Sequence, residues 1–237
     1  MSDHDLFEAE ESALRAAVHV HDLEGLDAAA YRQALGALIG EFRRLVRQTR
    51  RVILHSDRQE RDLNMLNARL KELAAELDYK ATHDPLTNAY NRRAVVERTG
   101  KYLEDGAVAL IVLDIDHFKR INDEYGHPAG DAVIVELVTR VRAAAPTHAE
   151  IGRVGGEEFT VVLPGTGLDD ALALAERMRA DVAAVPFALA TRRTVTASFG
   201  VSHTAQGRPF GDAYSRADSA LYEAKRGGRN RVCSADA

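Results

Sequence analysis

The chain has 237 residues, 46% of them hydrophobic, with 31 lysines and arginines against 36 aspartates and glutamates and a formal net charge of −5 at pH 7. That charge gives no electrostatic reason to expect nucleic-acid binding, and the longest apolar run, residues 107–113, is far shorter than the roughly 20 residues of a membrane span. The single cysteine, Cys233, excludes an intramolecular disulfide and a cysteine-rich zinc site, so we expect a reducing, cytoplasmic setting.

The first part of the chain, residues 1–34, is acidic, and the stretch from Glu8 to Val20 is compatible with a short amphipathic helix. His19 and His21 suggest a zinc sensor, but residues two apart do not share a helix face. The region has no cysteine that could complete a metal site. We therefore interpret it as an acidic N-terminal helical segment with surface histidines.

A long heptad pattern follows over residues 35–79. Apolar residues recur at alternating spacings of three and four with no proline, which predicts one long helix. About 43 residues of helix span roughly 65 Å, more than the short N-terminal segment could cover. We therefore favour a dimeric coiled coil over a helix packed on its own chain. The positions in register are Leu35, Leu38, Phe42, Leu45, Thr49, Val52, Ser56, Gln59, Leu63, Leu66, Leu70, Leu73 and Leu77.

The middle of this helix has two further features. The polar residues Thr49, Ser56 and Gln59 at register positions weaken the seam locally, so a regulated slip is expected there. A basic cluster overlaps the same region, and we interpret it as a solvated helix face rather than a nucleic-acid site. Its members are Arg43, Arg44, Arg47, Arg50 and Arg51.

Residues 80–237 alternate between helix and strand patterns and form the third predicted region. The turn at residues 84–87 places Thr87 to cap a helix over 88–103. The continuous apolar run 107–114 predicts a buried strand. A β-hairpin with a glycine turn is expected over 151–163, a strand over 195–201, and further helices over 130–145, 168–185 and 213–225. This order predicts an α+β fold of the ferredoxin-like type, with helices packed around an antiparallel sheet.

Acidic residues gather where the strands end. Asp114 follows a buried apolar strand, and an unpaired carboxylate there needs a cation, which can be an arginine or a metal. The hairpin tip carries Gly155, Gly156, Glu157 and Glu158, where glycines can adopt positive φ and let a ligand approach the backbone. If the hairpin pairs beside the Asp114 strand, Asp114 and Glu157 converge on one cation. Oxygen ligands of this kind select Mg²⁺ or Mn²⁺, commonly together with substrate phosphates.

Candidate phosphate and base ligands lie nearby in the sequence. Backbone N–H groups and one ammonium are available at residues 117–119. Lys225 and Arg229 could share a face if their helix continues through two glycines, or they could only complement the helix dipole. Asn122 and Asp131 flank a turn and carry the donors and acceptors that suit a purine edge, although each is also a common turn or cap residue. Together these groups suggest a metal-dependent nucleotidyl-transfer site.

Five stretches carry a family resemblance: DPLTNAYNRR, DIDHFKRINDEYGHPAGD, RVGGEEF, SFGV and ADSALYEAKRGGRNR. In their order and spacing they resemble the GGDEF family of diguanylate cyclases, over roughly residues 80–235. The resemblance implies a catalytic domain similar to class III nucleotide cyclases. It also implies a reaction in which two domains, each holding one GTP, meet to make cyclic di-GMP.

The resemblance implies roles for individual residues. Asp114, Glu157 and the backbone carbonyl of Ile115 match the metal-binding positions, for two Mg²⁺ or Mn²⁺ ions per site. Glu157 also matches the position usually credited with accepting the 3′-hydroxyl proton, although a metal-bound carboxylate is an awkward base. With Asp114 and Lys119 it forms the expected catalytic set. The expected substrate contacts are Asn122 and Asp131 for guanine, His127, Gly155 and Gly156 beside the substrate, and His117, Phe118, Lys119, Lys225 and Arg229 for the triphosphate.

Two comparisons with the family pattern matter. The hairpin has Glu157 where many members have aspartate, a variant common among active members. The R-x-x-D motif of product inhibition would need arginine and aspartate at positions held by Pro146 and Ala149, so we expect no feedback site of that kind.

The sequence therefore predicts a diguanylate cyclase that condenses two GTP into cyclic di-GMP and two pyrophosphates as a homodimer held by the coiled coil. Two alternatives remain open: a non-catalytic module that binds GTP or cyclic di-GMP, and a cyclase that makes mixed-purine cyclic dinucleotides. An upstream sensor protein or ligand is a further possible partner, and neither nucleic acid nor a membrane is expected to be one. The input signal and the basal activity are not encoded in any pattern we recognise.

Overall fold

A computed structural model describes residues 7–22, 28–187 and 194–235 of the chain. The chain divides into two compact units, Met1–Ala74 and Ala75–Ala237, which are described separately. No helix within the described ranges is long and apolar enough to cross a membrane. The division into segments 1–34, 35–79 and 80–237 remains a prediction.

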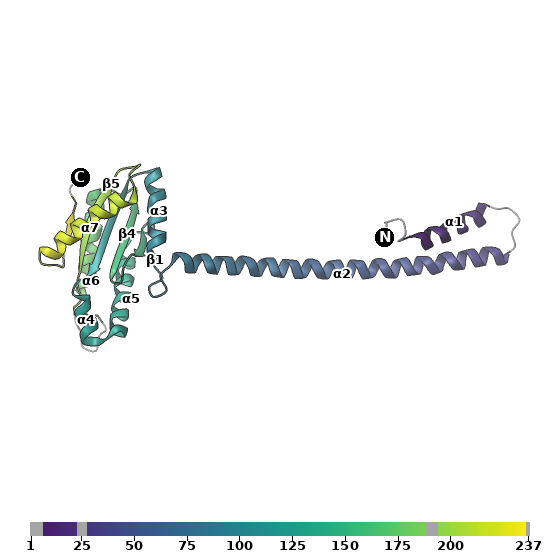
Figure 1. Cartoon of the computed structure of the whole chain (residues 1–237), viewed down its shortest axis with the longest axis horizontal. Helices are drawn as coiled ribbons and strands as arrows, with labels where there is room; N and C mark the ends of the chain where they lie inside the picture. The colour runs from purple at the N-terminus through teal and green to yellow at the C-terminus, as the bar shows by residue number, and fades with distance from the viewer. Residues whose placement is uncertain (1–6, 23–27, 188–193, 236–237) are drawn as a thin grey trace. The chain divides into compact units, whose positions relative to one another are not determined.

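The first unit consists of helix α1 (Glu8–Asp22) and most of helix α2 (Ala28–Thr82), both labelled in Figure 1. The long helix is confirmed and extends beyond the heptad stretch at both ends. Neither α1 nor α2 contains a buried residue, and the register leucines are largely exposed, such as Leu63 at 60% and Leu77 at 67%. Most of the apolar seam of α2 therefore stays exposed within the described residues, apart from the part near Leu38 and Leu45 that lies beside α1.

The second unit is built around one six-stranded sheet with strand order β1-β3-β4-β2-β5-β6. Its strands are β1 (Tyr90–Asn91), β2 (Val108–Ile115), β3 (Glu150–Arg153), β4 (Glu158–Pro164), β5 (Ala197–Thr204) and β6 (Val232–Ser234). The central strand β2 pairs antiparallel with both β4 and β5, while β1 and β6 add parallel edges. The four inner strands have the ferredoxin-like arrangement that the element order predicted.

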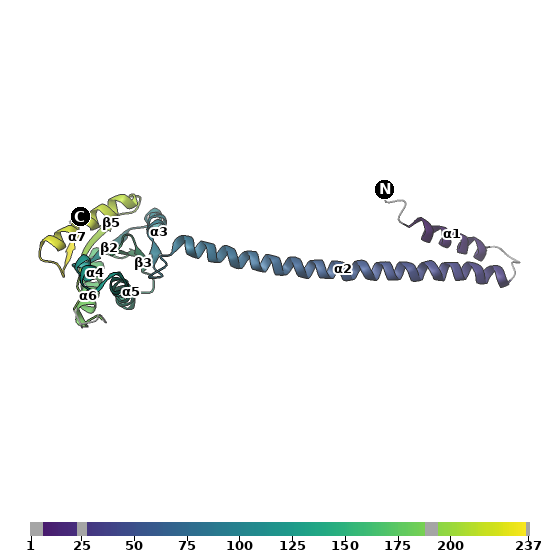
Figure 2. The ribbon, with the colours of Figure 1, turned by 60° about the horizontal axis from the view of Figure 1, so that its bottom comes forward.

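Helices cover both faces of the sheet (Figure 2). Alternate residues of β2 point to opposite faces, and each face has its own apolar core. Ile111 and Leu113 pack with helices α4 (Phe118–Tyr125), α5 (His127–Ala144) and α6 (Leu168–Ala184). Leu110 and Val112 pack with α3 (Arg92–Asp105) and α7 (Phe210–Arg226). Because both faces are buried, β2 is apolar without alternation up to Asp114.

Two local expectations were wrong. Thr87 does not cap a helix, because its backbone N–H and hydroxyl both donate to Asp84 Oδ1 within the turn. Helix α3 begins at Arg92 instead, and the side chain of Asn91 caps it by accepting from the Ala94 N–H at 3.0 Å.

The other concerns the helices near the predicted site. The segment before Gly126 forms the separate helix α4, and α5 begins at His127 rather than near residue 130. Helix α7 ends at Arg226, one residue beyond the predicted end, and Gly228 and Arg229 have φ values of 111° and 62°. Of the two alternatives for Lys225 and Arg229, a shared face on one continuous helix is therefore excluded.

Candidate active site

Asp114 lies next to last in β2 and points to the sheet face that α7 covers. Its side chain is only 13% exposed, and Lys225 in the last turn of α7 places Nζ 2.9 Å from Oδ2. Burial raises the pKa of Asp114, which Lys225 partly counteracts. A half-buried carboxylate with one nearby cation is thus built into the end of the central strand.

Glu157 lies at the tip of the β3–β4 hairpin. Burial, and next the negative charge of Asp114, raise the pKa of Glu157, and Lys225 lowers it. The two predicted metal-binding carboxylates are therefore near enough to repel each other, and a cation between them would relieve this repulsion. Ile115, whose carbonyl was the third expected ligand, follows Asp114 and is 1% exposed.

The donor set fits a hard cation that shares its ligands with a substrate. Within the described ranges no cluster of three or more histidines, cysteines, aspartates or glutamates could hold a metal ion. Two carboxylates and a backbone carbonyl leave coordination positions open, and Mg²⁺ usually keeps such positions for water and substrate phosphates. The residues present therefore fit a nucleotide-dependent metal site rather than a closed structural one.

The glycines of the hairpin act differently from the expectation. Neither Gly155 nor Gly156 has a left-handed φ. A Cβ on Gly155 would lie 3.0 Å from Glu158 Oε2 and 3.2 Å from Glu158 Cβ, whereas a Cβ on Gly156 would meet nothing within 4 Å. Gly155 is needed for the tight hairpin, and Gly156 keeps open space at its tip.

Glu158 is a further acidic residue of the site that the sequence did not single out. It pairs with Asp114 across β2 and β4, and the hydroxyl of Tyr214 in α7 donates to its Oε1 at 3.2 Å. Burial is the largest cause that raises the pKa of Glu158 and of Tyr214. No spacing rule links positions 158 and 214, so only the folded chain reveals this contact.

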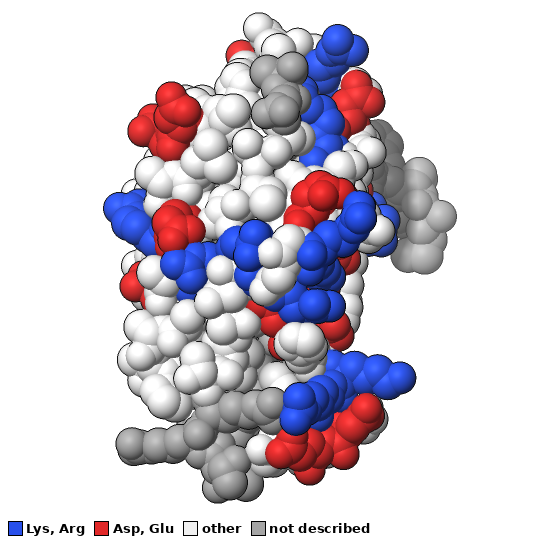
Figure 3. All heavy atoms as spheres, turned by 90° about the vertical axis from the view of Figure 1, so that its left-hand side faces the viewer, with Lys and Arg blue, Asp and Glu red and all other residues white. Residues whose placement is uncertain are grey.

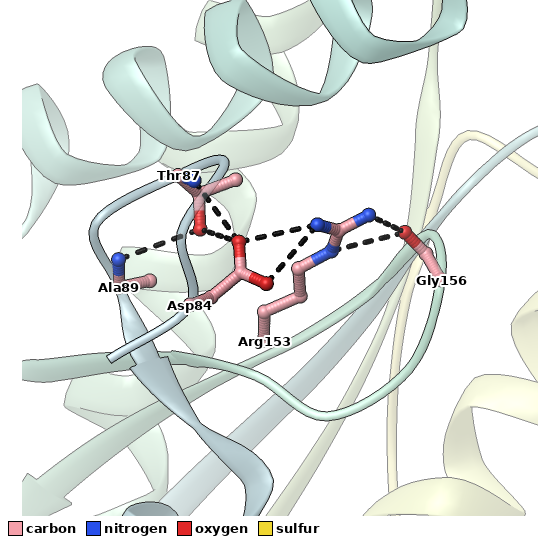
Figure 4. A network of polar contacts seen from close by, with 5 residues as sticks. All are labelled: Asp84, Thr87, Ala89, Arg153 and Gly156. Atoms are coloured by element: carbon pink, nitrogen blue, oxygen red, sulfur yellow. Dashed lines mark hydrogen bonds and ion pairs between the residues drawn. The ribbon is translucent and has the colours of Figure 1, made fainter. Parts of the chain in front are cut away.

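The hairpin tip is tied to the turn that precedes α3 (Figure 4). The Arg153 guanidinium lies 3.1 Å from Asp84 Oδ1 and also donates to the carbonyl of Gly156 at 2.6 Å. The same Asp84 oxygen accepts from the backbone and hydroxyl of Thr87. One aspartate and one arginine therefore fix the loop that carries Glu157 relative to the turn after α2.

The predicted phosphate ligands lie at two places in the second unit. His117 has a left-handed φ of 59° and begins α4, and its side chain is exposed, as is that of Lys119. Phe118 is 6% exposed and belongs to the core, so only its backbone can face a ligand. Arg229 is exposed and interacts electrostatically with Asp114, which places it on the Lys225 side of the site.

The predicted guanine ligands meet at the α4–α5 corner. Asn122 Oδ1 is buried without a hydrogen-bond partner within the described ranges, and a Cβ on Gly130 would lie 1.9 Å from it. Glycine at 130 therefore lets α5 approach Asn122 closely. His127 and Asp131 are exposed on α5 at the same corner.

Asp116 is a second residue that the sequence reasoning missed. It is 6% exposed and accepts hydrogen bonds from the hydroxyls of Thr196 and Ser198, both at 2.7 Å, and from the Asn230 N–H at 3.0 Å. The aspartate thereby anchors the segment next to Arg229. The sequence feature that could have identified Asp116 is its position as a second aspartate two residues after Asp114.

The positions of the missing feedback motif line a different groove. This groove has a volume of about 770 Å³ and lies outside the Asp114 site, with no predicted site residue in its lining. Pro146 and Ala149 lie there, together with Arg142, His148 and Glu150. The Glu150 carboxylate accepts hydrogen bonds from Arg98 and Tyr102.

On the face that carries α7, charges of both signs gather (Figure 3). Lysine and arginine side chains collect across the middle of this face, with acidic side chains among them. Such a mixture suits a ligand that combines metal ions with phosphates better than it suits a simple polyanion.

The chain belongs to the GGDEF family: residues 81–231 match the family model described as "Diguanylate cyclase, GGDEF domain". It is 44% identical over 160 residues to the diguanylate cyclase DgcP of Pseudomonas aeruginosa, covering 65% of this chain and 24% of that protein. The chain spans between about a quarter and a half of the length of the first curated relatives it matches.

Solved structures extend the likeness to the N-terminal helices. The coiled coil and GGDEF domain of DgcB from Caulobacter crescentus, in complex with c-di-GMP, is similar with a TM-score of 0.72 and 31% identity, over 76% of this chain and 98% of that one. The diguanylate cyclase SiaD of Pseudomonas aeruginosa, in complex with its activator SiaC, is similar with a TM-score of 0.65 and 32% identity, over 95% of this chain and 86% of that one.

Proposed function

We propose that this protein is a diguanylate cyclase that condenses two GTP molecules into cyclic di-GMP with release of two pyrophosphates. The observation that carries the proposal is geometric: Lys225 Nζ lies 2.9 Å from Asp114 Oδ2, and Asp114 pairs across the sheet with Glu158, the neighbour of Glu157. A metal-bound triphosphate would neutralise both kinds of charge in this site. The metal ions would offset the two repelling carboxylates, and the phosphates would offset the lysine. Family membership and the relatives named as diguanylate cyclases support the assignment.

Asp114, Glu157 and the Ile115 carbonyl would hold Mg²⁺ or Mn²⁺, two per site by resemblance to the family. When bound, the metal supplies charge stabilisation at the phosphoryl oxygens. Lys119, Lys225 and Arg229, with the backbone at His117 and Phe118, would bind the triphosphate. Asn122 and Asp131 would bind guanine, with His127 and the hairpin glycines beside the substrate.

In each half-reaction the 3′-hydroxyl oxygen of one GTP attacks the α-phosphorus of the facing GTP in line. The O3′–P bond forms while the bond from the α-phosphorus to the pyrophosphate oxygen breaks. By resemblance to the family, Glu157 matches the position credited with accepting the hydroxyl proton, although a carboxylate that also binds the metal is an awkward base. The protein contributes mainly position and charge, because the two substrates must face each other.

The second substrate would come from a second copy of the chain. We assign the dimer contact to the exposed seam of α2, where a parallel coiled coil would raise the local concentration of facing domains. An upstream sensor protein or ligand would act on the N-terminal helices. The likeness to SiaD over 95% of this chain supports an N-terminal regulatory segment.

Incubation of the purified protein with GTP, ATP and Mg²⁺, followed by mass spectrometry of the products, tests the proposal against its alternatives. We expect the mass of cyclic di-GMP alone. Binding of GTP without product would indicate a non-catalytic module, and a hybrid mass would indicate a mixed-purine cyclase.

Glu157→Gln should abolish turnover while the domain stays folded, and Glu176→Gln on the exposed surface of α6 is the matched control. Full activity in the Glu157 variant would refute the role assigned to that residue.

A further inference from the structure

The two N-terminal helices leave a second apolar stripe uncovered on each of them. Helix α1 partly covers one stripe of α2, which includes Leu38, Glu41 and Leu45. The neighbouring residues remain 40 to 64% exposed. On α2 they are Tyr31, Leu35, Ile39, Phe42 and Val46, and the similarly exposed residues of the other helix are Leu14 and Val18 on α1 and Phe7 directly before it.

The angle between the stripes is informative. At 3.6 residues per turn, the covered and exposed stripes of α2 lie about 95° apart, and those of α1 lie about 100° apart. A helix that packs on one neighbour needs a single stripe, whereas a helix in a four-helix bundle contacts neighbours on two sides. The predicted seam residues Leu35, Leu38, Phe42 and Leu45 belong alternately to the two stripes. The seam itself therefore points between them, as it would toward a bundle axis.

Acidic side chains border the groove between the two helices. This groove has a volume of about 220 Å³ and is lined by four apolar and three acidic residues: Leu14, Leu38, Phe42, Leu45, Glu10, Glu11 and Glu41. Both carboxylate oxygens of Glu10 and one of Glu41 are buried without a hydrogen-bond partner in the described part of the chain. The nearby cation is Arg44, at 3.8 Å from Glu10 and 3.4 Å from Glu41. Buried acids of this kind call for further donors.

Charge indicates which helix of a second copy covers the exposed stripe. Arg43 and Arg50 flank that stripe of α2 on the side away from α1, so a second α2 placed there would set arginine against arginine. Helix α1 is acidic in its first turn. The Glu10–Arg44 contact fixes how antiparallel α1 and α2 are aligned along their length. A two-fold axis parallel to the helices preserves this axial alignment between subunits. Glu11 of the partner subunit therefore comes opposite Arg43.

We propose that the homodimer begins with a four-helix bundle in which α1 of each protomer also packs on the exposed stripe of the partner's α2. This inference rests on the homodimer of the proposed function. The two α2 helices then lie diagonally across the bundle and continue into the two-stranded coiled coil beyond the end of α1. Every neighbour in the bundle is antiparallel, and acidic α1 meets basic α2 at each new contact.

Single-cysteine cross-linking tests the arrangement in a Cys233→Ser background. Two differently tagged full-length chains are co-expressed, one with Leu14→Cys and the other with Ile39→Cys, so that any disulfide must join two chains. We expect a cross-link between the two tags under mild oxidation. Ala16→Cys, on the other side of α1, replaces Leu14→Cys in the control and should give none.

A third variant separates failure of the bundle from failure of the dimer. Leu66→Cys lies on the coiled-coil seam and should form a disulfide with its own copy. If Leu66→Cys cross-links but Leu14→Cys and Ile39→Cys do not, the bundle is wrong, the homodimer stands, and a different protein is left to cover the groove. If Leu66→Cys does not cross-link, the proposed homodimer is wrong and the bundle falls with it.

Charge reversal gives an independent readout in solution. Arg43→Glu and Glu11→Arg should each raise the dimer dissociation constant about two- to fivefold, the range of exposed ion pairs, and the double variant should restore it. Arg51→Glu, away from both stripes, should have no such effect and is the matched control. Equal weakening by the Arg43 and Arg51 variants, with no recovery in the double variant, would overturn the assigned contact.

Discussion

The two units of this chain differ in how they are stabilised. The second unit buries two separate apolar cores, one on each face of its sheet, whereas α1 and α2 contain no buried residue at all. Fixing a chain costs conformational entropy that only burial and hydrogen bonding offset. The second unit can therefore fold on its own contacts, whereas the exposed apolar stripes of the N-terminal helices would gain most of their stability from packing on another helix.

Under the proposed function, this difference ties activity to assembly. One domain would hold one substrate, and the reaction would need a second site facing it. If the N-terminal helices form the dimer contact, a signal acting there would change catalysis without altering either core. The polar residues Thr49, Ser56 and Gln59 in the seam of α2 lie where such a change requires the least energy.

The largest effect should follow removal of residues 1–74. The second unit should stay folded because both of its cores remain, but its rate at nanomolar protein should fall about 100-fold, since the local concentration of the facing domain is lost. Activity measured over a range of protein concentrations checks this. The truncated protein should show second-order dependence on its concentration, and a concentration-independent rate would contradict the role of the helices.

The same substitution should have opposite effects in the two units. In Gly200→Ala the new Cβ would lie 2.1 Å from the Ala217 carbonyl oxygen and 2.3 Å from the Leu221 nitrogen, so α7 must move away from β5 at a cost of about 3 kcal/mol. In Gly36→Ala the Cβ meets nothing within 4 Å, and helix propensity should stabilise α2 by up to about 1 kcal/mol. Denaturant unfolding and helix content by circular dichroism measure the two changes. Equal effects would show that the two units unfold together.

The Asp84–Arg153 contact should matter for both stability and rate. Asp84→Asn removes a partner that is 18% exposed beside an arginine that is 16% exposed, which should destabilise the second unit by about 1 to 2 kcal/mol. The loop with Glu157 should lose order, so kcat should fall more than the affinity for GTP. Asp78→Asn, exposed near the end of α2, is the control. An unchanged kcat would show that the turn does not hold the hairpin.

The smallest effect concerns pH. The pKa of Glu157 is raised by burial and by Asp114. At pH values between the ordinary glutamate pKa and this raised pKa, the folded state therefore binds more protons than the unfolded state. Stability should therefore fall as pH rises through that window. Glu157→Gln should raise Tm by about one degree at pH 7, and the gain should vanish below the ordinary carboxyl pKa. Glu72→Gln on exposed α2 should change Tm at neither pH.

Much of the fold followed from local patterns. The apolar run at 107–113, the glycine hairpin and the helical spacing of the later segments each reflect burial on one or two faces, and burial dictates residue type along the chain. Two of the helix starts did not follow. The Asp84 side chain binds Thr87 within a closed turn, so α3 begins only at Arg92, and α5 begins at His127 directly after α4, and neither start could be inferred from periodicity alone.

The site divides in the same manner. Asp114 and Glu157 were identifiable because acidic residues after an apolar strand and beside paired glycines are costly unless they bind something. Glu158, Tyr214 and Asp116 were not, because their partners come from segments more than fifty residues away and no spacing rule connects them.

The order of amino acids was thus enough to identify the family and the long heptad helix and to nominate the main acidic and basic candidates, since each depends on a repeat or motif within a short stretch. Only the folded chain established that Lys225 rather than Arg229 contacts Asp114, that Arg153 joins the hairpin to the preceding turn, and that α1 and α2 each keep a second apolar stripe. Those facts depend on which distant surfaces come together, and close packing in three dimensions decides that.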